Sequence, residues 1–214
     1  MTNASAAIVP LIEQIDRYLA DLTGPGIAEV RRGILRFGQG PAREGIEPAP
    51  PACGHLDAAL LCIHGADPLR GAINEARSAL RWVTYDAYPP ETIGRRFPVA
   101  HGFVSLIGVQ GFLPADDFEL GLFLVAPRTL YRDHRHPAPE LYASLTGPHE
   151  WRFGTDEDWT EYGAHTPIWN EPMRVHATLV RAVPFLALFA WTRDVTADAV
   201  LVSAADWAEV EAGL

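Results

Sequence analysis

The sequence is poor in basic residues. It carries 17 Lys and Arg against 27 Asp and Glu, a net charge of −10 over 214 residues. This balance argues against nucleic acid or an anionic membrane as a partner, because both would favour a basic surface. It is compatible with a small cationic or zwitterionic substrate.

The sequence also lacks long apolar runs, and we expect no leader segment. No run of about 18 apolar residues occurs, so we expect no membrane span. The first residues have no basic stretch, and acidic residues interrupt their apolar ones, which argues against a signal peptide. Cys53 and Cys62 are too few for a disulfide framework and too far apart for a CxxC pair. We therefore expect a cytoplasmic protein.

The apolar residues of the first 85 positions recur every three or four residues, which is the spacing of amphipathic helices. A proline-rich loop at residues 41–54 interrupts them. The spacing predicts helices over Ala6–Leu22, Ile27–Phe37, Leu56–Ile63 and Pro68–Trp82. We therefore predict an N-terminal helical segment over residues 1–85.

The pattern changes from residue 86 onward, where short apolar runs alternate with Gly, Pro and Asp. The run that begins at Glu140 places Leu141 and Ala143 on one face and Glu140 and Tyr142 on the other. Strands are predicted within 101–109, 118–127, 140–147, 174–182 and 184–192. Short strands with such breaks predict an antiparallel sandwich or barrel over residues 86–214, with polar residues facing its lumen.

Histidine and carboxylate side chains gather between Tyr131 and Gly147. His134 and His136 are two residues apart, so on a strand they point to the same side, and Glu140 follows after a Pro-Ala-Pro corner. Two imidazoles and a carboxylate on neighbouring strands suit a divalent transition metal. Because these ligands accept Fe, Zn, Mn, Ni and Co alike, we expect one such ion without choosing among them.

The pattern HxHxxxE, followed by six residues and a glycine, resembles the first motif of the cupin superfamily. A strand that follows a proline turn and bears His176 resembles the second motif. The resemblance implies a mainly β fold, a cupin (double-stranded β-helix, jelly-roll) barrel preceded by helices, with His176 as a further metal ligand. His165 lies near the second motif and is the alternative ligand if that strand is shifted in register.

Three positions depart from the cupin motifs. Arg128 and Met173 stand where the motifs usually have glycine, and Val180 stands where an asparagine often follows. These are turn and packing positions, so the departures concern local geometry more than metal binding.

Residues from Gly121 to Thr192 resemble one cupin family more closely, the bacterial dimethylsulfoniopropionate (DMSP) lyases. The matches are a tyrosine three residues before the first histidine, HxHPAxELY, the VHA strand and the closing PFLALFAW. The resemblance implies a β-elimination that splits DMSP, a small zwitterionic sulfonium compound, into dimethyl sulfide and acrylate. The resemblance implies that His136, Glu140 and His176 bind the metal, and that His134 is a further ligand or an immediate neighbour that contacts substrate. It implies that Tyr142 is the base and that Tyr131 supports it and contacts substrate. It implies that the ring of Trp191 faces the sulfonium.

The residue types suit this chemistry. A proton α to a carboxylate is weakly acidic, and a divalent metal on that carboxylate stabilises the developing charge by on the order of several kcal/mol. A tyrosine, with a pKa near ~10, is mostly protonated at neutral pH. A nearby metal favours the phenolate, which can then act as a base. An aromatic ring holds a sulfonium by a cation–π contact of roughly 0.5–2 kcal/mol.

Simpler interpretations stay open for the aromatic residues. Tyr142 also fits a half-buried barrel position. Trp191 lies in a very apolar strand, where core packing is an equal expectation. Trp151 and Trp169 are further candidates for the pocket wall.

Tyr131 raises a question of geometry. It is three residues from His134, which is the opposite parity on a regular strand. Only a bulge or bend at Arg132 and Asp133 would place both side chains in one pocket.

Two other functions remain open on these residues. One is a different cupin enzyme, such as a dioxygenase or an isomerase, with the same ligands and another substrate. The other is a non-catalytic cupin that binds metal or ligand. Cupins frequently pair, so the resemblance also allows a homodimer.

Overall fold

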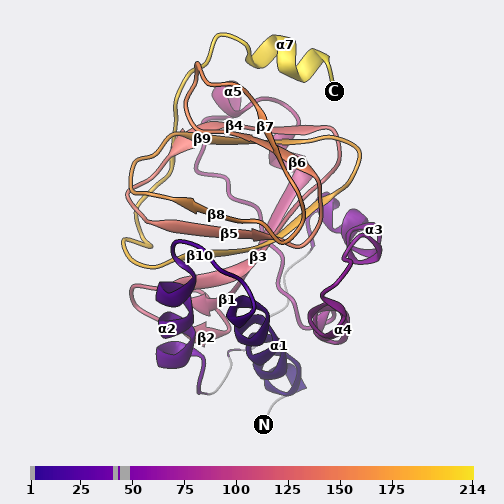
Figure 1. Cartoon of the computed structure of the whole chain (residues 1–214), viewed down its shortest axis with the longest axis vertical. Helices are drawn as coiled ribbons and strands as arrows, with labels where there is room; N and C mark the ends of the chain where they lie inside the picture. Colours follow the sequence, from indigo (N-terminus) through magenta and orange to yellow (C-terminus); the bar gives the residue numbers. More distant parts are fainter. Residues whose placement is uncertain (1–2, 41–42, 44–48) are drawn as a thin grey trace.

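The computed structural model describes residues 3–40, 43 and 49–214, and its elements are drawn in Figure 1. The helices are α1 (Asn3–Ala20), α2 (Ile27–Phe37), the 3-10 helix η1 (Pro51–His55), α3 (Leu56–Leu61), α4 (Asp67–Ala76), α5 (Pro90–Ile93), α6 (Phe97–Ala100) and α7 (Trp207–Ala212). The strands are β1 (His101–Gly108), β2 (Leu113–Pro114), β3 (Glu119–Val125), β4 (Thr129–Arg135), β5 (Glu140–Ser144), β6 (His149–Arg152), β7 (Thr160–Tyr162), β8 (Pro167–Asn170), β9 (His176–Val180), β10 (Phe185–Trp191) and β11 (Val200–Leu201).

The strands form two sheets that face each other (Figure 1). One has the order β2-β1-β3-β10-β5-β8 and the other β11-β4-β9-β6-β7. β1 and β2 run parallel, and the other paired strands are antiparallel. This double-sheeted barrel, with helices before it, confirms the predicted mainly β cupin fold.

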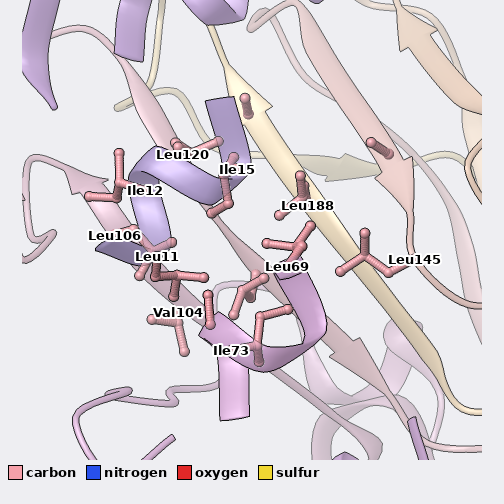
Figure 2. Packing of buried hydrophobic residues seen from close by; sticks show 14 of the residues in the cluster. Leu11, Ile12, Ile15, Leu69, Ile73, Val104, Leu106, Leu120, Leu145 and Leu188 are labelled. Atoms are coloured by element: carbon pink, nitrogen blue, oxygen red, sulfur yellow. The ribbon is translucent and has the colours of Figure 1, made fainter. Parts of the chain in front are cut away.

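The N-terminal helices pack on the outer face of the six-stranded sheet (Figure 1). Leu11 of α1, Ile73 of α4 and Leu188 of β10 belong to one buried cluster, shown in Figure 2. The buried residues of α1 recur at the predicted three- and four-residue spacing: Ile8, Leu11, Ile12, Ile15 and Leu19. Each such burial contributes roughly 1.5–3 kcal/mol, so helices and sheet share one hydrophobic core.

The inner face of the same sheet turns toward the second sheet. On β10, Leu188 packs against the helices while Phe189 belongs to the inner cluster. On β5, Leu141 faces outward and Tyr142 inward, which confirms the predicted alternation. The inner cluster is rich in aromatic residues, and the polar site lies among them.

Some predicted boundaries are wrong. α4 ends at Ala76, so the helix does not extend to Trp82. Trp82 is instead buried in the core, and Val83 pairs with Phe103 in a β-bridge, so contact with the sheet fixes this segment. Most of the predicted loop at 41–54 lies outside the described residues, and its end forms η1. The division of the chain into 1–85 and 86–214 stays a prediction.

Five short strands (β2, β6, β7, β8 and β11) and four short helices (η1, α5, α6 and α7) were not predicted. β6, β7 and β8 are three or four residues long and mix polar with apolar residues, so no apolar run marks them. α5 and α6 are four-residue helices. Among the described residues, no helix combines the length and the apolarity that crossing a bilayer requires.

The two positions where the cupin motifs usually have glycine keep a glycine-like backbone. Arg128 has φ 58° and Met173 has φ 63°, both in the left-handed region. That conformation costs a non-glycine residue on the order of 1–2 kcal/mol. Backbone hydrogen bonds hold both turns, from Arg128 N–H to the Arg181 carbonyl (2.7 Å) and from Met173 N–H to the His136 carbonyl (2.8 Å).

Candidate active site

Three buried histidines converge on the inner side of the five-stranded sheet. His134 on β4 is paired across the strands with His176 on β9, and His136 follows β4 directly. One ring nitrogen from each lies within 4.8 Å of the others. The cluster can therefore hold a metal ion.

Each histidine is held in one tautomer. The Nδ1 atom of each ring lies at hydrogen-bond distance from a backbone carbonyl two residues away, and a carbonyl can only accept, so Nδ1 donates. Each neutral ring therefore has its lone pair on Nε2, as metal-binding histidines do. The carbonyls belong to Arg132 (2.8 Å, to His134), Ala138 (2.8 Å, to His136) and Arg174 (3.0 Å, to His176).

Glu140 completes the cluster. Its Oε2 atom lies 3.2 Å from His136 Nε2 and 3.3 Å from His176 Nε2. A nitrogen this close to a carboxylate oxygen needs either a proton or a metal cation between the two atoms. Among the described residues the buried Nε2 of His176 has no hydrogen-bond partner, so it is free to bind a metal. This donor set, three imidazoles and one carboxylate, fits a divalent transition metal.

The charges of the cluster follow from burial and proximity. Burial, then His176, holds the pKa of His134 well below its ordinary value and keeps the ring neutral, as a ligand must be. Burial alone would raise the pKa of Glu140, but His136 and His176 hold it well below the usual range. Glu140 is therefore an anion. Burial acts to lower the pKa of His136, but the charge of Glu140 outweighs burial and raises that pKa.

Glu140 is oriented by its neighbours across the sheet. It lies opposite Trp191 on β10 and Asn170 on β8. The indole N–H of Trp191 donates to Glu140 Oε1 at 2.8 Å, and the Asn170 amide donates to Oε2 at 3.2 Å. The Trp191 ring also stacks on the His136 ring, with centroids 4.4 Å apart. Trp191 therefore supports two of the candidate ligands.

A bulge in β4 brings Tyr131 to the same side as His134. Tyr131 pairs with Thr178 and His134 with His176, so three steps on β4 match two on β9. The extra residue lies at Arg132–Asp133, where the sequence required it. The Tyr131 and His134 rings stack with centroids 3.9 Å apart.

The cluster opens into a cavity of about 620 Å³. Tyr131, Tyr142 and the candidate ligands His134, His136 and Glu140 line it. The hydroxyls of Tyr131 and Tyr88 are hydrogen-bonded at 2.7 Å. Much of the remaining wall is aromatic: Tyr85, Tyr88, Phe103, Phe123, Phe189 and Trp191.

Tyr142 lies two residues after Glu140 on β5 and faces the same cavity. Burial, and then the charge of Glu140, raises its pKa well above the ordinary value of a tyrosine. A cation held by the histidines would act in the opposite direction and favour the phenolate.

A sequence model of the dimethylsulfoniopropionate lyase family matches residues 24–187, about three quarters of the chain. The chain belongs to the DMSP lyase family. It is therefore a carbon–sulfur lyase, as its motifs predicted.

Two solved structures share the fold along almost the whole chain. The DMSP lyase DddQ from Ruegeria pomeroyi DSS-3 superposes with a TM-score of 0.75 at 23% identity, covering 94% of this chain and 98% of that one. A chain from the crystal structures of the DMSP lyases RdDddP and RnDddQII gives 0.74 at 21% identity, covering 94% and 100%. No curated protein sequence matches the chain.

Other residues considered from the sequence lie outside this candidate site. His165 is hydrogen-bonded to the Tyr18 hydroxyl (2.9 Å) and the His64 carbonyl (2.6 Å), so it does not replace His176. Trp151 is buried beside Tyr142, with ring centroids 5.2 Å apart, and is not part of the cavity wall. Trp169 donates to Glu171 and packs against the helical core.

The sequence did not point to Tyr85, Tyr88, Phe103, Phe123 or Phe189. The three phenylalanines have inward parity on predicted strands, so strand alternation could have indicated them. Tyr85 and Tyr88 lie in the irregular segment before α5, which has no periodic pattern.

The outer side of the bulge carries a buried ion network. Asp133 is fully buried and accepts two hydrogen bonds from Arg152, from Nε at 2.9 Å and Nη2 at 2.6 Å. Trp207 of α7 donates to the same carboxylate at 2.7 Å, and Arg152 also binds Asp206. α7 is thereby attached to the bulge that places Tyr131.

Replacing Arg152 by alanine is expected to lower the free energy of unfolding by about 3–5 kcal/mol, because Asp133 would be left buried without its cation. Arg181→Ala removes an exposed partner of Glu150 and is expected to cost about 1 kcal/mol or less. Urea unfolding of the two variants checks this. Equal losses of unfolding free energy in the two variants would show that the buried Asp133–Arg152 pair contributes no more to stability than the exposed pair.

Proposed function

We propose that this chain cleaves DMSP to dimethyl sulfide and acrylate, with a divalent metal held by His134, His136, Glu140 and His176. The observation that carries the proposal is the meeting of this ligand set with Tyr142 in one aromatic cavity. Membership of the DMSP lyase family supports the same substrate.

When bound, the metal would supply a positive charge to the substrate carboxylate and so make the adjacent C–H bond more acidic. Tyr142 would be the base. As a phenolate it takes the α proton, and the electron pair of that C–H bond becomes the new C=C bond. The C–S bond then breaks, its electron pair leaves on sulfur as neutral dimethyl sulfide, and the proton returns to solvent.

The other cavity residues would position the substrate. Tyr131, fixed by the hydroxyl of Tyr88, would contact the substrate beside His134. Trp191 would present its ring to the sulfonium and contribute a cation–π attraction of roughly 0.5–2 kcal/mol. The aromatic wall would keep water away from the phenolate and preserve its basicity.

The proposal is tested by removing all metal from the protein and reloading it with Fe(II), Zn, Mn, Ni or Co in the absence of oxygen. We expect dimethyl sulfide and acrylate in equal amounts from at least one metal-loaded sample and neither from the metal-free protein. Oxygen consumption without these products would favour a dioxygenase instead. Metal binding without turnover of DMSP would favour a non-catalytic role.

A further inference from the structure

A second carboxylate lies beside Trp191, on the side away from the metal cluster. Trp191 pairs with Glu140 on β5 and with Glu119 on β3. Residues directly opposite each other on neighbouring strands share a face, so Glu140, Trp191 and Glu119 form one row across the sheet. Two strand spacings separate the carboxylates, which places their β-carbons roughly 9–10 Å apart.

Glu119 faces the same cavity as the candidate ligands. It is one of the lining residues, together with Phe103, Phe189 and Trp191. Its side chain lies over the start of the β1–β2 turn, because a Cβ added at Gly108 would be 3.4 Å from Glu119 Cγ. The carboxylate therefore lies in the wall of the substrate cavity.

No cation of the described chain neutralises Glu119 at salt-bridge distance. Arg81 lines the same cavity, but its guanidinium lies over the Phe112 ring at 4.3 Å and donates to the Gln110 carbonyl. Burial raises the pKa of Glu119 to about 7, with Ser105 acting in the opposite direction. A half-buried carboxylate without a counter-ion is costly, so it either takes up a proton or is neutralised by a cationic ligand.

We propose that Glu119 receives the cationic end of the substrate, across Trp191 from the metal cluster. This inference rests on the proposed function for the identity of the substrate. Glu140 and the histidines define the end that takes the substrate carboxylate, and Glu119 defines the end that takes the sulfonium. The pair selects zwitterions over simple carboxylates and fixes the direction in which the substrate binds.

The test compares ligands that differ in charge. In Glu119→Gln, the dissociation constant of DMSP is expected to rise about 10- to 100-fold, because one partly desolvated opposite charge is lost. The inhibition constant of acrylate, which has a carboxylate and no cation, is expected to change less than about 2-fold. Calorimetry on the metal-loaded protein measures both ligands.

Two variants serve as controls. Asp198→Asn removes an exposed carboxylate that also lines the cavity. The dissociation constant of DMSP and the inhibition constant of acrylate are expected to stay within about 2-fold of the wild-type values, because water screens that charge. Glu119→Asp keeps the charge and is expected to recover most of the affinity for DMSP. Thermal melting of each variant shows whether it folds.

Two results would overturn the inference: equal weakening of DMSP and acrylate in Glu119→Gln, or no weakening of either. Binding of a quaternary-ammonium carboxylate of the same length separates this test from that of the proposed function, because that compound has a poor leaving group and is not cleaved. If the wild type releases no dimethyl sulfide but binds this zwitterion in a Glu119-dependent way, the lyase proposal fails and the cation site stands.

Discussion

Tyr142→Phe is expected to lower kcat for dimethyl sulfide release by about 10²- to 10⁴-fold, the usual contribution of a positioned general base. Phenylalanine keeps the ring that packs against Phe123 and Trp151, so the cavity wall is retained. Metal content should stay within about 2-fold of the wild type. Headspace measurement of dimethyl sulfide, with metal analysis of the same sample, checks both statements.

The matched control is Tyr162→Phe. Tyr162 is on β7 of the same barrel, where its ring packs against Phe153, and it is not among the lining residues of the cavity. This variant should keep wild-type activity. If Tyr142→Phe retained more than about a tenth of wild-type kcat, another residue would have to be the base.

Glu140→Gln is expected to weaken metal binding by at least about 100-fold. Loss of a group that only supports a metal ligand already lowers metal affinity by about 10- to 100-fold. Glu140 is itself a candidate ligand, and its carboxylate lies 3.2 and 3.3 Å from two imidazole nitrogens. Activity should fall in step with metal occupancy. Titration of the metal-free protein with Zn, followed by calorimetry, measures the affinity.

The metal-free stability of Glu140→Gln separates this effect from misfolding. The substitution removes a buried negative charge but keeps an amide oxygen that can accept a hydrogen bond from Trp191, so the metal-free variant should unfold at a urea concentration close to that of the metal-free wild type. Glu150→Gln, which alters the exposed pair with Arg181, should change neither property. Unaltered metal affinity in Glu140→Gln would exclude this carboxylate from the ligand set.

The convergence of the candidate ligands was predictable because it depends on local rules. His134 and His136 point to one side through strand parity, and the following corner returns Glu140 to the same cavity on β5. The bulge at Arg132–Asp133 followed from the same parity, since Tyr131 could reach the pocket in no other way. His176 required more, because only the resemblance to a cupin motif connected it with residues forty positions earlier.

Other parts of the site depend on long-range packing that no periodicity encodes. Tyr88 reaches Tyr131 from an irregular segment 43 residues earlier. Asp133 meets Trp207 across 74 residues through side chains alone. The early end of α4 has the same origin, because Trp82 and the neighbouring bridge to β1 bind the sheet more favourably than a continued helix would.

The central claim is a metal-dependent elimination with Tyr142 as base, and release of dimethyl sulfide into the headspace above DMSP tests it most directly. We expect release from the metal-loaded wild type, with an equal amount of acrylate. We expect at most about a hundredth of that rate from the metal-loaded Tyr142→Phe variant and from the metal-free wild type. Equal release from all three samples, or none from any reloaded wild type, would contradict it.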